Sequence, residues 1–73
     1  MNTQQTFKPA PSREFVIVVV DQGSGSVAVE LDVEGTWVTV ENVTSDGYVR
    51  VFVLGSTFRV TPTGDAEYRV IGA

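Results

Sequence analysis

Apolar and polar residues alternate along most of the chain after residue 14, with the period of two that is typical of β-strands. The clearest case is residues 26–33, where valines and a leucine alternate with small or acidic residues. Residues 14–21 are instead almost continuously apolar, which favours a strand that is buried on both faces or lies in an interface. Strands are predicted at residues 14–21, 26–33, 36–41, 48–54, 57–61 and 66–71.

Short segments rich in glycine and other turn-forming residues separate the predicted strands. Parallel strands need crossovers of roughly a dozen residues, so these connections favour antiparallel pairing. No segment shows the periodicity of an amphipathic helix. We therefore expect an all-β fold, a small antiparallel β-sandwich or barrel of about six short strands.

The first thirteen residues differ from the rest because they are mostly polar and contain Pro9 and Pro11. Each proline drives the residue before it toward extended geometry. We expect a flexible N-terminal arm over residues 1–13 and a single domain over residues 14–73. The arm is either a tail without a role or a segment that lies along a neighbouring subunit, in which case Phe7 is its anchor.

The chain is short, and its composition removes two common ways of stabilising a small fold. A domain of 73 residues buries a modest share of its surface and often needs a disulfide, a metal or a partner subunit. Cysteine and histidine are both absent, which excludes disulfides and the usual zinc ligands. The remaining way to stabilise so small a fold is oligomerisation or docking on a larger assembly.

The charge balance disfavours polyanionic partners. The net charge is −4, and the five basic residues are scattered along the sequence, so we expect no nucleic-acid and no membrane binding. The longest apolar run, residues 15–20, is too short to span a bilayer. The polar start of the chain lacks the hydrophobic region of a signal peptide, so we expect synthesis in the cytoplasm.

Few residues offer catalytic chemistry. Without histidine or cysteine, no serine or thiol nucleophile has its usual base. Glu30, Asp32 and Glu34 alternate on one strand face and are interpreted as a solvated acidic stripe. Asp46 and Asp65 stand beside glycines, where turn formation explains them better than calcium binding. We expect no enzyme, no catalytic residues, no metal site and no cofactor.

An apolar surplus is the most informative feature. Residues 14–21 have no polar face, and on residues 48–54 aromatic and leucine side chains lie opposite the alternating valines. Coverage by loops or the arm is one explanation, and a subunit interface is the favoured one. The candidate interface residues are Phe7, Phe15, Ile17, Val19, Tyr48, Arg50, Phe52 and Leu54.

Several short strands and glycine turns carry a resemblance to a known class of protein. They are Asp-Val-Glu-Gly-Thr-Trp-Val at residues 32–38, Asp-Gly-Tyr at 46–48 and Gly-Ser-Thr-Phe-Arg-Val at 55–60. This pattern resembles small β-rich structural proteins of tailed bacteriophages, of the head-decoration or fibre-adaptor type. The resemblance implies a virion location, no enzymatic activity, self-association as a homo-oligomer (a trimer by analogy) and a larger capsid or tail protein as partner.

Two other functions stay open. A carbohydrate-binding module would use Trp37, Tyr48 and Tyr68 as a stacking platform for sugar rings. An immunity or inhibitor protein would use its acidic strand to mask a basic target. Exposed, coplanar aromatic rings would favour the first, whereas an apolar strand face at a subunit contact would favour assembly.

Overall fold

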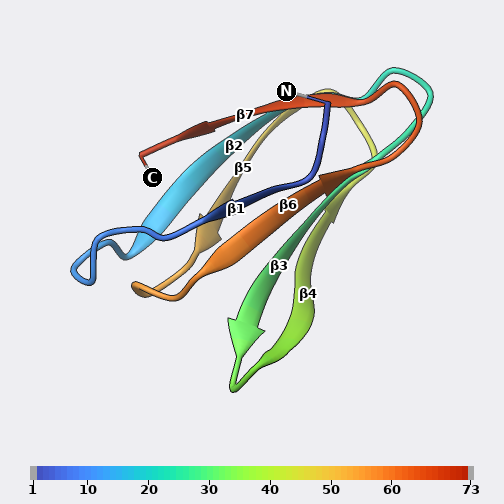
Figure 1. Cartoon of the computed structure of the whole chain (residues 1–73). Coiled ribbons are helices and arrows are strands. Elements are labelled where there is room, and N and C mark those ends of the chain that lie inside the picture. Colours follow the sequence, from blue (N-terminus) through green and yellow to red (C-terminus); the bar gives the residue numbers. More distant parts are fainter. Residues whose placement is uncertain (1, 73) are drawn as a thin grey trace.

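Seven β-strands, and no helix within the described part of the chain, make up the computed structural model, which describes residues 2–72 (Figure 1). The strands are β1 (Gln5–Phe7), β2 (Phe15–Asp21), β3 (Val27–Val33), β4 (Thr36–Val43), β5 (Gly47–Phe52), β6 (Phe58–Pro62) and β7 (Glu67–Ile71). One sheet has the order β1-β6-β3-β4 and the other β5-β2-β7. All pairings are antiparallel. The expected all-β antiparallel fold is confirmed, with one strand more than predicted.

The core lies between the two sheets and is built mainly from valine. Every second residue of a strand points to the same face, so the alternating pattern places one set of side chains inside. The buried apolar residues are Val16, Val18, Val20, Val27, Val29, Val43, Val51, Val53, Phe58, Val60, Ala66 and Tyr68. Burying one such valine or phenylalanine side chain stabilises the fold by about 1.5–3 kcal/mol.

Strand β1 is the element that the sequence pattern did not predict. Residues 5–7 lie within the expected arm, yet they pair with β6 at the edge of the four-stranded sheet. The Phe7 ring stacks on the buried Phe58 ring, with 5.0 Å between their centroids. The Tyr68 hydroxyl donates a hydrogen bond of 2.8 Å to the Thr3 carbonyl. This part of the arm therefore packs on the domain, with its aromatic residue as the point of attachment.

The β3–β4 hairpin extends beyond the other strands (Figure 1). Its two turn residues, Glu34 and Gly35, have φ of 53° and 86°, as a tight hairpin turn with the right twist requires. The pairing register shifts between Val29 and Glu30, which leaves Val40 on β4 as an extra, bulged residue. Beyond this β-bulge the side chain of Val38 is 42% exposed.

The loops at the opposite end of the sandwich hold each other through close contacts. Residues 22–26 lie against residues 63–65, and the Asp65 carboxylate accepts hydrogen bonds from both the backbone N–H and the hydroxyl of Ser24. Gly25 approaches Thr63 so closely that a Cβ atom would overlap with the Thr63 carbonyl oxygen. These contacts fix the start of β3 relative to the end of β6.

Candidate functional site

The outward side of the three-stranded sheet is unusually apolar for a surface. Strand β2 lies in the middle, and the antiparallel register places outward residues of β5 and β7 beside its own. We call this surface the outer β2 face. It consists of Phe15, Ile17, Val19, Tyr48, Arg50, Phe52, Arg69 and Ile71. Tyr48 is 74% exposed, Phe52 57% and Ile71 51%, so the apolar side chains on the two flanking strands lie mostly in solvent.

One end of the outer β2 face is ordered by contacts around Arg50. Its guanidinium lies 5.4 Å from the Phe15 ring centroid and 5.7 Å from that of Phe52. The two rings meet edge to face at 6.2 Å, as expected for directly opposite residues of β2 and β5. Cation–π contacts at exposed sites contribute about 0.5–1 kcal/mol each. These three side chains therefore form a preorganised aromatic surface.

The structure brings together six of the eight residues that the sequence analysis named for an interface. Phe15, Ile17 and Val19 come from β2, and Tyr48, Arg50 and Phe52 come from β5. Leu54 is also exposed, but it lies in the turn after β5, with a left-handed φ of 50°. Phe7 is elsewhere, since it packs on Phe58 between the sheets of its own domain. Its expected role as an anchor on a neighbouring subunit does not agree with this position.

Two members of the outer β2 face were missed by the sequence reasoning. Arg69 and Ile71 lie beside Val19 and Ile17 and complete the third column of the surface. The sequence did indicate that Arg69 and Ile71 point outward, because they alternate with Tyr68 and Val70, which point inward. The alternation identifies the faces of a single strand, whereas only the pairing of β7 with β2 shows which surface those residues join.

The outward side of the four-stranded sheet carries a charged cluster. The Arg59 guanidinium donates two hydrogen bonds to the Glu30 carboxylate, of 2.9 and 3.0 Å, and the Thr61 hydroxyl donates a third of 2.9 Å. Arg59 also lies 4.4 Å from the Trp37 ring centroid. The hydrogen bond from Arg59 lowers the pKa of Glu30 more than partial burial raises it. Glu30 is thus paired with a cation, which corrects its interpretation as part of a solvated acidic stripe.

The three aromatic residues considered for sugar binding do not share a surface. Trp37 lies beside Arg59 on the four-stranded sheet, and Tyr48 lies on the outer β2 face. Tyr68 is 3% exposed, and burial raises the pKa of its phenol. A common stacking platform of these rings is therefore not formed.

Other candidate sites give little indication of ligand chemistry. Asp46 and Asp65 accept backbone hydrogen bonds from Gln22 and Ser24, so both carboxylates take part in contacts between loops that are far apart in the sequence. Within residues 2–72, no group of three or more acidic residues is arranged to hold a metal ion. The same part of the chain contains no helix of the length and apolarity needed to cross a membrane.

Comparison of the chain with protein-family models, with curated proteins and with solved structures finds no match. What the chain does must therefore be inferred from its own surface, and the outer β2 face is its most distinctive part.

Proposed function

We propose that this chain is a non-enzymatic structural protein of a bacteriophage virion. It decorates the capsid or acts as a head or tail accessory protein, and it both self-associates and binds a larger assembly. The observation that carries the proposal is the outer β2 face, on which apolar side chains from three strands form one exposed surface.

The energetic argument depends on the size of the chain. A small domain has a total stability on the order of 5 kcal/mol. Each large apolar side chain that a partner buries contributes about 1.5–3 kcal/mol. Phe52, Tyr48 and Ile71 are all more than half exposed, so a contact that covered them would stabilise the fold substantially. Aromatic residues beside arginine, as at Phe15, Arg50 and Phe52, are typical of the centre of protein interfaces.

The virion part of the proposal is supported by the resemblance of the strand-and-turn pattern to phage structural proteins. A small sandwich with one apolar sheet face suits a protein that attaches to a repeating surface. The carbohydrate-binding alternative has less support, because Trp37, Tyr48 and Tyr68 are separated from one another.

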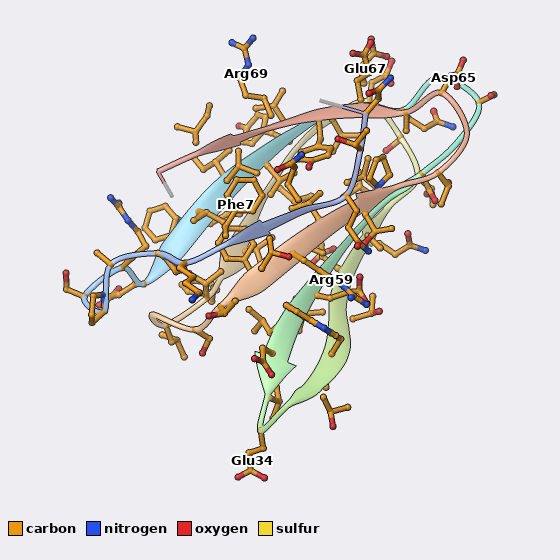
Figure 2. The ribbon with its side chains drawn as sticks, in the orientation of Figure 1. Phe7, Glu34, Arg59, Asp65, Glu67 and Arg69 are labelled. Carbon is orange, nitrogen blue, oxygen red and sulfur yellow. The ribbon has the colours of Figure 1, made fainter. Side chains whose placement is uncertain are left out.

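The test is sedimentation with virus particles. The tagged chain is produced in cells that are also producing the virus, and the virus particles are then purified on a density gradient. We expect the wild-type chain to travel with intact particles, and Phe52→Asp to stay at the top of the gradient. Glu34→Lys is the matched control, because Glu34 is at the tip of the β3–β4 hairpin and away from the outer β2 face (Figure 2).

Circular dichroism of both variants establishes that they are folded. If the folded wild-type chain is absent from particles, the virion role is wrong. If Phe52→Asp still travels with particles as well as the wild type does, the outer β2 face is not the docking surface.

A further inference from the structure

Charge is distributed unevenly between the outer β2 face and the rest of the chain. The chain has nine acidic and five basic residues, yet the charged members of this face are Arg50 and Arg69, and none is acidic. Asp21 and Glu67 lie opposite each other on β2 and β7, just beyond one end of the face. This apolar surface is therefore locally cationic, although the net charge of the chain is −4.

Neither arginine has a carboxylate partner in its own chain. Among the described residues, the only salt bridge lies elsewhere, on the four-stranded sheet. Arg50 instead lies over the rings of Phe15 and Phe52. A guanidinium that is already held in place loses little conformational freedom when an acceptor binds it. Its rigid fork of N–H donors matches the two oxygens of a carboxylate.

A partner cannot cover the exposed apolar side chains without covering the arginines as well. Arg50 lies between Tyr48 and Phe52 on the outward side of β5. Arg69 lies next to Ile71 on the outward side of β7. Covering a charged group with an apolar surface is strongly unfavourable, unless the partner provides an opposite charge with hydrogen bonds. A partner of this face therefore needs an acceptor for each guanidinium.

We propose that the outer β2 face binds an acidic protein surface on which apolar side chains lie between two carboxylates. This inference rests on the proposed function, because it states the chemistry of the larger assembly that the face contacts. The register sets the spacing, since Arg50 lies directly opposite Ile17 on one side of β2. Arg69 lies directly opposite Val19 on the other side. The dimensions of a sheet then place the two arginines about 12 Å apart, which matches carboxylates three or four residues apart in an extended segment.

The same features favour a protein over other anionic partners. Nucleic acid is bound mainly through many lysine and arginine contacts to phosphates. The outer β2 face offers two arginines, and the apolar side chains of Ile17 and Val19 lie between them. Asp21 and Glu67 would repel a continuous row of phosphates at one end of the face. A protein surface can provide carboxylates at two points with apolar side chains between them.

The experiment is a selection of displayed random peptides on the immobilised full-length chain, with removal of the peptides that also bind Phe52→Asp. We expect the enriched peptides to combine apolar residues with at least two aspartates or glutamates. Arg50→Glu and Arg69→Glu should each bind a synthetic enriched peptide at least about tenfold more weakly than wild type, as measured by fluorescence anisotropy. Lys8→Glu is the matched control and should bind as wild type does, because it makes the same charge change just after β1, in the other sheet.

A charge exchange separates direct pairing from an indirect effect of the substitutions. The double variant Arg50→Glu/Arg69→Glu should bind the enriched peptide once the acidic residues of that peptide are replaced by lysine, and wild type should not. Circular dichroism establishes that each variant is folded. If the exchanged pair does not bind, the arginines do not pair with the carboxylates of the peptide, and the inference is wrong.

Other results also overturn the inference. Enriched peptides without acidic residues indicate a purely apolar partner, and peptides that resemble the outward residues of β2 or β5 indicate a second copy of the chain. Binding to vesicles of phosphatidylcholine and phosphatidylserine, without enrichment of any peptide, indicates a lipid surface. No enrichment and no vesicle binding mean that the face has no acidic partner. No virus particles are used, so these outcomes are independent of the sedimentation test of the virion role.

Discussion

At the scale of single residues, Gly25 is the position where the fold depends most directly on the absence of a side chain. A Cβ atom there would overlap with the Thr63 carbonyl oxygen, which belongs to backbone and has little freedom to move. We expect Gly25→Ala to lower the free energy of unfolding by about 3 kcal/mol, the upper end of the usual cost of overpacking. Chemical denaturation measures it.

Gly35→Ala is the matched comparison. No atom lies within 4 Å of a Cβ built at Gly35, but its φ of 86° is left-handed. Only backbone strain opposes this substitution, and its cost is expected to be about 1 kcal/mol. If both substitutions lowered the free energy of unfolding equally, the close approach of Gly25 to Thr63 would not be fixed in solution.

Asp65 gives a prediction for pH. Its hydrogen bonds from Ser24 hold its pKa below the ordinary value, so the folded state favours the charged carboxylate. The stabilisation is present above a pH of about 4 and is lost as the pH falls through the lowered pKa of the folded state. Asp65→Asn should therefore melt below wild type near neutral pH, and this difference should shrink below about pH 4. Thermal melts across that range test it, and a difference that is constant with pH would contradict the expected linkage.

At the scale of elements, β1 changes what is expected of the N-terminal segment. A flexible arm over residues 1–13 would contribute little to the stability of the domain. The structure instead predicts that deleting residues 1–7 lowers the melting temperature, because Phe58 then loses the stacked Phe7 ring and β6 loses its neighbour. Calorimetry of the deletion measures the effect. Gln5→Ala is the control, since its exposed side chain bonds only to Thr3 in the same segment.

The difference between prediction and structure has a physical cause at this scale. Residues 26–33 repeat the period of two often enough to be recognised, and the inward and outward faces of this strand were predicted correctly. A three-residue strand contains one repeat at most, so β1 left no pattern. The ion pair of Arg59 with Glu30 could not be predicted either, because it depends on β6 lying beside β3. The alternation of apolar and polar residues does not specify which strands are neighbours.

At the scale of the whole molecule, stability and association should be coupled. If an acidic partner, such as a peptide selected on the outer β2 face, binds there, the folded state is stabilised by mass action, and the melting temperature rises with the concentration of that partner. We expect this rise for wild type and its absence for Phe52→Asp, which places a charge among the aromatic rings of the contact. Scanning calorimetry over a hundredfold concentration range measures it. A wild-type melting temperature that does not change would show that the domain reaches its full stability alone.

The β-bulge at Val40 matters most where many copies are crowded together. Strand β4 is an open edge of its sheet, and a straight edge strand offers a row of unpaired N–H and C=O groups to any passing chain. The register shift between Val29 and Glu30 interrupts that row, because the bulge re-aims the backbone groups on either side of it. A foreign strand therefore cannot add along the full length of β4. In this way the chain can be concentrated on a surface without its sheets joining edge to edge into fibres.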